Sequence, residues 1–175
     1  MSDKTNDEKL RILQERLAQI KQKKDIPAAK NNIAVLRKDL IGIEDLKTTL
    51  EKEFTNLNII ELDQLTNGQA ITCYQALKEV EDLSGPLTIS ACDNGVIFNN
   101  DELKSLLSDE EVDIIVWAAR GYPGASRNPD MYGWLHADEN NKILEVSVKK
   151  PLSNPDEDFV IIGTFTYKNA NMFNS

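Results

Sequence analysis

Short apolar segments alternate with amphipathic segments over much of the chain, and this alternation constrains the fold more than any other feature. Four apolar runs have the length and composition of buried strands, at residues 33–36, 59–62, 87–91 and 114–118. The segments between them have the apolar spacing of helices, at 43–54, 70–83 and 101–107. Strands that alternate with helices predict an α/β fold with a mostly parallel central sheet and right-handed crossovers.

The pattern changes from Tyr132 onward. Three further strands are predicted at 132–138, 143–150 and 159–167, with no helix between them. Clusters of turn residues at 138–141 and 153–158 separate these strands. The chain is therefore expected to begin as α/β and to end as meandering β-structure.

The first 30 residues form a separate, charged segment. Leucine and isoleucine recur there at helical spacing, which predicts an amphipathic helix over 6–24, at Leu10, Leu13, Leu17 and Ile20. Asp25-Ile26-Pro27 ends this helix, because the residue before proline avoids the helical region. Two interpretations are open: the helix packs on the protein, or it forms a surface for a partner or a second copy. The predicted organisation is thus a charged helix and linker over 1–30 and one domain over 31–175.

Charge is distributed unevenly along the chain, and this distribution argues against general nucleic-acid binding. Residues 1–30 have a net charge of +3, and the remainder has −12, within a total of −9. An acidic body repels polyanions, which argues against nucleic-acid binding, although a metal ion can still hold a nucleotide there. Neither an apolar run of about 18 residues nor a signal-peptide core is present, so a cytoplasmic location is predicted.

The chain contains two cysteines and one histidine. Cys73 falls in a predicted helix and Cys92 at the end of the predicted strand PLTISAC, so both are expected to be buried thiols and not a disulfide. His136 has no recognised metal-ligand spacing to either cysteine. A zinc site of the usual kind is therefore not expected.

Asp93 follows the third predicted strand, within Asp93-Asn94-Gly95. In open α/β sheets, ligands bind outside the carboxyl ends of strands, where a carboxylate can hold a metal ion or a sugar hydroxyl. The same three residues are also a strong turn signal. Local sequence leaves both interpretations open.

Four stretches occur in a fixed order over about 140 residues, and their order carries a family resemblance. They are LTNGQAITCYQAL, GPLTISACDNGVIF, NPDMYGWLHADENNKILEVSVKKPL and VIIGTFTYKNANMF. The sequence resembles the nucleotidyltransferases that join a sugar phosphate to a nucleoside triphosphate, and most of all the branch of capsule and surface-polysaccharide synthesis. The resemblance implies a Rossmann-like three-layer fold and an Mg²⁺-assisted displacement of pyrophosphate. It also implies a nucleotide and a sugar phosphate as ligands.

The resemblance assigns roles to particular residues. Asp93 matches the metal-binding aspartate, and Lys150 matches the lysine that contacts the sugar phosphate. The loop that reads the nucleobase corresponds to Gly68, Gln69 and Ala70. The residues beside the sugar correspond to Tyr132, Gly133, Lys149 and Gly163; a glutamate is usual at the position of Lys149.

Each of these residues also has a purely structural interpretation. Gly68 fits a turn, Gln69 a helix cap, Gly133 and Gly163 strand bulges, and the two lysines a solvated strand end. The tryptophans, Trp117 and Trp134, are expected in the core. Arg120 and Arg127 flank the loop GYPGAS, where arginines either meet a phosphate or face water.

The family's Gly-rich loop, G-x-G-[ST]-R, which wraps the triphosphate with backbone N–H groups, does not occur in these 175 residues. The family's C-terminal region and second metal aspartate have no match either. We therefore expect either an incomplete nucleotidyltransferase that is weakly active or inactive alone, or a non-catalytic interaction protein that reuses the fold.

Overall fold

The computed structural model describes residues 30–173, and the predicted helix over 6–24 lies outside that range. One compact unit contains the described residues up to Leu83 together with Gly95–Ser105. The other contains Ser84–Asn94 and the chain from Leu106 onward. None of the described helices has the length and apolar character needed to cross a membrane.

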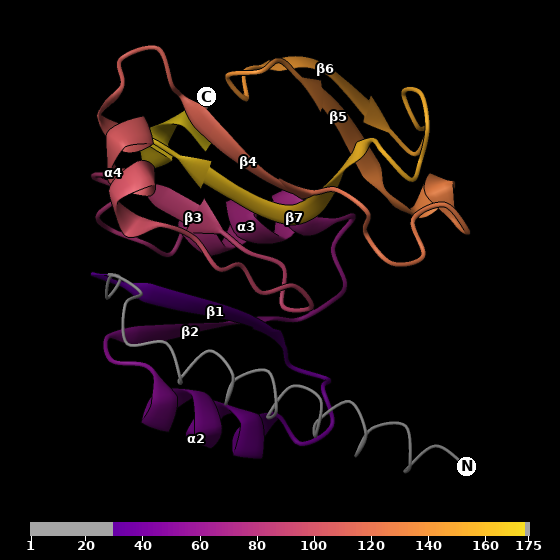
Figure 1. The fold of residues 1–175 in the computed structure, drawn as a ribbon. Coiled ribbons are helices and arrows are strands. Elements are labelled where there is room, and N and C mark those ends of the chain that lie inside the picture. Colours follow the sequence, from indigo (N-terminus) through magenta and orange to yellow (C-terminus); the bar gives the residue numbers. More distant parts are fainter. Residues whose placement is uncertain (1–29, 174–175) are drawn as a thin grey trace. The chain divides into compact units, whose positions relative to one another are not determined.

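The first unit is built on two parallel strands, β1 (Asn32–Arg37) and β2 (Leu57–Leu62), with α2 (Ile43–Glu53) between them in sequence (Figure 1). Helix α3 (Gln69–Leu77) follows β2. The parallel pair confirms the predicted βαβ start. Helix α3 is shorter than predicted, because backbone N–H groups of Glu79 and Val80 bond three residues back and tighten the chain into turns.

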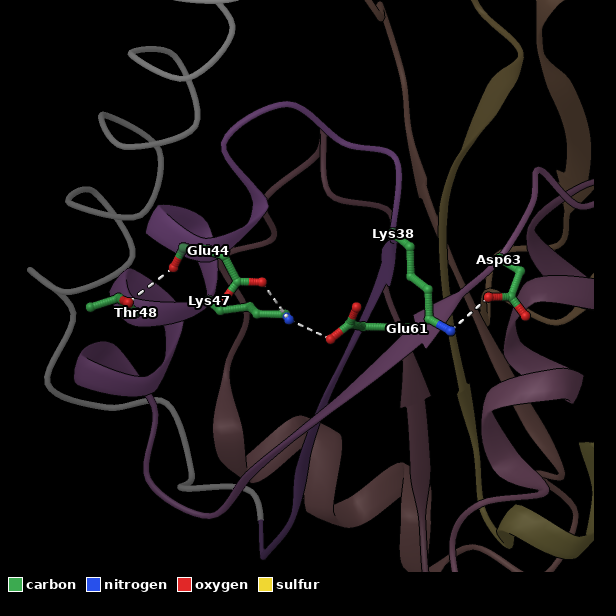
Figure 2. A network of polar contacts seen from close by, with 6 residues as sticks. All are labelled: Lys38, Glu44, Lys47, Thr48, Glu61 and Asp63. Carbon is green, nitrogen blue, oxygen red and sulfur yellow. Dashed lines mark hydrogen bonds and ion pairs between the residues drawn. The ribbon is translucent and has the colours of Figure 1, made fainter.

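Lys47 connects α2 to β2 through a polar network (Figure 2). Its ammonium group lies 3.0 Å from Glu44 one turn earlier and also bonds Glu61 on β2. The Lys47 side chain is only 19% exposed, and its bonds to Glu61 and then to Glu44 raise its pKa. A second pair, Lys38 and Asp63 at 2.6 Å, joins the residues that follow β1 and β2. Charged contacts thus align the helix with the strands.

The second unit is an antiparallel sheet around the long strand β7 (Phe159–Tyr167). Its other strands are β3 (Leu87–Ile89), β4 (Ile114–Ala119), β5 (Gly133–Ala137) and β6 (Ile143–Val148). The C-terminal half of β7 pairs with both β3 and β4, which therefore occupy opposite edges of it. The N-terminal half pairs with β4 and with β5, so β3 and β5 share one edge. Strand β6 completes a hairpin with β5 (Figure 1).

Three short elements connect or follow these strands. Helix α4 (Asn100–Ser108) precedes β4, as predicted, and begins with two acidic residues in its first turn. The 3₁₀ helices are η1 (Pro129–Met131), before β5, and η2 (Ala170–Phe173), after β7.

The expectation of one mostly parallel sheet is wrong. Among the described strands, only β1 and β2 pair in parallel, while β3 and β4 both run antiparallel to β7 in a different sheet. Apolar periodicity locates strands in the sequence. It does not specify which neighbouring strand will form hydrogen bonds with their backbone N–H and C=O groups. The three C-terminal strands were predicted correctly, but they do not form a meander, because β7 pairs with β5 and not with β6. Strand β7 also pairs with β3 and β4, which the pattern assigned to the α/β part.

Trp134 is at the centre of the core of the second unit. Its side chain is 0% exposed and packs with Ala125 and Val160. Its indole N–H donates to the Pro129 carbonyl at 3.0 Å, so its one polar atom is satisfied. Trp117 is half-buried and donates its indole N–H to the Thr166 hydroxyl at 3.0 Å. Both tryptophans are therefore structural, as expected.

Both cysteines are free thiols, in agreement with the prediction. Cys73 is half-buried in α3, and burial raises its pKa. Cys92 is exposed, contrary to the prediction, because β3 ends at Ile89 and Cys92 lies in the turn that follows.

Asp158 closes the loop between β6 and β7 and makes stability pH-dependent. Burial opposes ionisation of its carboxyl group, but bonds from the Ser153 hydroxyl and from backbone N–H groups outweigh burial and lower its pKa below the ordinary aspartate value. A lowered pKa stabilises the fold above the ordinary aspartate pKa, and this contribution is lost as pH falls through the folded-state value. We expect Asp158→Asn to lower the free energy of unfolding at pH 7 by about 1 kcal/mol, a modest cost because the loop is partly solvated.

Urea denaturation of Asp158→Asn at pH 7 and below pH 4 tests this expectation. The difference in free energy of unfolding between the variant and the native chain should be smaller below pH 4 than at pH 7. Asp156→Asn is the matched control, because Asp156 lies in the same loop and its exposed side chain makes none of these bonds. If Asp158→Asn lowers the free energy of unfolding equally at both pH values, the charge of Asp158 is not the cause of the destabilisation.

Candidate functional site

A bulge in β7 is the organising feature of the candidate site. Trp117 of β4 pairs with Thr164, but the next residue pairs with Ile161, which leaves Ile162 and Gly163 as extra residues. Gly163 has φ 75°, a left-handed conformation that glycine adopts without steric cost. Its carbonyl accepts the backbone N–H of Ala91 at 3.1 Å. The bulge is thus attached to the segment that follows β3.

Asn94 fixes this segment, and sequence reasoning treated it only as a turn residue. Its side-chain amide donates to the Ile162 carbonyl at 3.2 Å and to the Asp93 carboxylate at 3.3 Å. Its side-chain oxygen accepts the Tyr122 hydroxyl at 3.0 Å. One side chain therefore connects the Asp93 turn, the β7 bulge and the loop after β4. Nothing local in the sequence identifies it, because its partners lie 28 and 68 residues away.

Asp93 lies in a turn just beyond the end of β3, which confirms the turn interpretation and leaves its role toward a ligand as a prediction. The residue is exposed. Among residues 30–173, no group of three or more His, Cys, Asp or Glu side chains is placed to hold a metal ion. A single carboxylate fits Mg²⁺ that is shared with substrate phosphates, since this ion is often held by one or two carboxylates plus phosphates.

Tyr132 and Gly133 lie beside the same part of β7. Gly133 pairs with Ile161, two residues before Gly163, and a Cβ at Gly133 would meet the Ile161 side chain at 3.3 Å. The Tyr132 ring lies edge-on to that of Tyr122, with centroids 5.5 Å apart. The structure therefore brings Asp93, Tyr132, Gly133 and Gly163 into one connected set around the bulge.

Lys149 and Lys150 follow β6 next to this set. The Lys149 N–H donates to the Tyr132 carbonyl at 2.8 Å, and its backbone is left-handed, with φ 62°. Both lysine side chains are exposed, and neither forms an ion pair with any carboxylate of residues 30–173. They are therefore a solvated strand end with two uncompensated positive charges.

Gly68, Gln69 and Ala70 belong to the first unit, and all three are exposed. Gly68 has φ 111° and ψ 169°, a region open almost only to glycine, and it caps α3, which begins at Gln69. The Gly68 carbonyl accepts the backbone N–H of Thr72 at 3.2 Å. The N-cap residue of α3 is thus Gly68, and not Gln69 as predicted. This unit also has an open depression along β2 and α3, lined by Asn58–Leu62, Gln75, Lys78 and Glu79.

Comparison with known proteins shows the fold. No family model and no curated protein matches the sequence. The crystal structure of HddC from Yersinia pseudotuberculosis is similar with a TM-score of 0.58 at 14% identity, over 93% of this chain and 64% of HddC. UDP-glucose pyrophosphorylase, in its complex with UDP-glucose, is similar with a TM-score of 0.55 at 11% identity, over 82% of this chain and 60% of that enzyme.

The fold is thus a mixed α/β fold similar to those of HddC and UDP-glucose pyrophosphorylase. The chain spans less than two thirds of the length of either protein.

Proposed function

We propose that this chain is a nucleotidyltransferase-like domain that binds a nucleotide and a sugar phosphate, of the branch that serves capsule and surface-polysaccharide synthesis. The observation that carries the proposal is the β7 bulge, which holds the Asp93 turn beside Gly133 and Gly163. At Gly163 the backbone has no Cβ atom, which permits close approach of a sugar, whereas at Gly133 the Ile161 side chain occupies the space that a Cβ would take. The similarity of the fold to a pyrophosphorylase that binds a nucleotide sugar supports the same ligand class.

In this proposal, each predicted residue has a distinct part. Within the first unit, taken by itself, Gly68 and Ala70 would contact a nucleobase through their backbone and Gln69 through its side-chain amide. Asp93 holds the magnesium ion, which neutralises phosphate charge when it is bound. Lys150 meets the sugar phosphate, and the residues beside the sugar are Tyr132, Gly133, Lys149 and Gly163.

Calorimetric titration of the full chain with nucleoside triphosphates and nucleotide sugars, with and without Mg²⁺, tests the proposal. We expect Mg²⁺-dependent binding that Asp93→Asn weakens by about tenfold or more, because the change removes the charge and keeps the shape. Asp113→Asn is the matched control, since Asp113 is an exposed aspartate of the same unit.

Equal affinities of the native chain and Asp93→Asn would show that Asp93 is not part of the binding site. An absence of binding to every nucleotide would overturn the proposed function and favour the alternative, a non-catalytic interaction protein. The lack of a G-x-G-[ST]-R stretch in the sequence is the observation that favours this alternative.

A further inference from the structure

The loop between β4 and η1 carries two arginines, Arg120 and Arg127, in an acidic environment. The second unit contains 12 Asp and Glu residues against six Lys and Arg residues. Despite this excess of carboxylates, neither arginine forms an ion pair within residues 30–173. Two guanidinium groups thus remain available for an anion from solution.

Each guanidinium group lies next to an uncharged residue. Arg120 lies over the Phe159 ring, 4.2 Å from its centroid, which orients the planar group and leaves its N–H edges accessible. Arg127 lies across Gly124, where a Cβ would sit 3.5 Å from the Arg127 Nη2 atom. Gly124 has φ 87°, so the turn that places Arg127 favours glycine.

Two contacts fix the loop, one to the core of the second unit and one to the candidate site. Ala125 is buried against Trp134 and Val160, which anchors the middle of the loop in the core. The Tyr122 hydroxyl bonds Asn94, whose amide contacts the Asp93 carboxylate. Backbone bonds from Ala125 to Tyr122 and from Arg127 to Gly124 keep the segment between these anchors compact.

We propose that this loop binds the phosphate group of the sugar phosphate, with Arg127 as the principal contact and Arg120 as a second one. The proposal rests on the proposed function and adds residues that the family resemblance did not assign. A guanidinium group matches a phosphomonoester with two parallel N–H donors, a geometry that a lysine cannot offer. The loop then holds the phosphate near Asp93, where a shared magnesium ion would meet it.

Titration of the full chain with glucose 1-phosphate, mannose 1-phosphate and inorganic phosphate at low salt tests this assignment. We expect Arg127→Gln to weaken binding of at least one hexose 1-phosphate by about ten- to a hundredfold, and Arg127→Lys to weaken it less. Lys142→Gln is the control, because it removes the same charge from an exposed position in the same unit. Circular dichroism checks that each variant is folded. If Arg127→Gln does not fold, the affinity of Arg127→Lys still tests the assignment.

The outcomes separate this inference from the proposed function. If the native chain binds a hexose 1-phosphate and Arg127→Gln binds as tightly as Lys142→Gln, the inference fails and the proposed function stands. If only Lys150→Gln loses affinity, the phosphate lies on Lys150 and the inference fails as well. If the native chain binds no phosphate compound, both proposals are overturned.

Discussion

Purified chain of 175 residues, given Mg²⁺, a nucleoside triphosphate and a hexose 1-phosphate, is expected to release pyrophosphate no faster than a buffer control. Positioning and charge stabilisation supply nearly all the catalysis in phosphoryl-type transfer. A Gly-rich loop would donate several backbone N–H groups and two cations, and the sequence has no such stretch. Each such contact is worth about 2–4 kcal/mol in the transition state, so the loss of several slows the reaction by many powers of ten.

A coupled pyrophosphate assay with all common nucleoside triphosphates and a panel of sugar phosphates measures this directly. The binding titrations described above are the companion experiment, because binding without turnover is the expected combination. Turnover by the native chain that Asp93→Ala abolishes would contradict the prediction. It would mean that another part of the chain, such as the basic segment with Lys21, Lys23 and Lys24, contacts the triphosphate.

Replacement of Trp134 by alanine should destabilise the second unit by about 3–5 kcal/mol. The side chain is 0% exposed at the centre of the core, so its removal leaves a large cavity against Ala125 and Val160. It also leaves the Pro129 carbonyl without its indole donor. This loss is a large fraction of the stability of a typical domain, about 5–15 kcal/mol.

Urea denaturation followed by fluorescence measures the effect, because both tryptophans of the chain, Trp117 and Trp134, lie in the second unit. Trp117 remains as the reporter in Trp134→Ala, and circular dichroism provides a second signal. His136→Ala on the same strand is the control, since its exposed side chain should change stability by less than about 0.5 kcal/mol. A midpoint shift no larger than that of His136→Ala would show that Trp134 does not anchor this core.

Local patterns in the sequence were enough to locate most of the secondary structure. The helix predicted over 43–54 corresponds to α2, and the helix predicted over 101–107 corresponds to α4. The three C-terminal strands also lie where their alternation and turn residues predict them. Apolar spacing and capping residues act within a few positions along the chain, and for that reason the sequence alone reveals them.

The pairing of β7 with β3 and β4 was decided by the tertiary structure, because backbone hydrogen bonds do not depend on side-chain identity. The same is true of the candidate site. Motif resemblance pointed to Asp93 and Gly163, but the contact from Asn94 to Ile162 that links the Asp93 turn to the β7 bulge spans 68 residues. Likewise, the sequence around a loop arginine does not show whether the arginine forms an ion pair with a carboxylate in the folded protein. Only the folded chain shows that Arg127 lies across Gly124 and forms no ion pair with any carboxylate of residues 30–173.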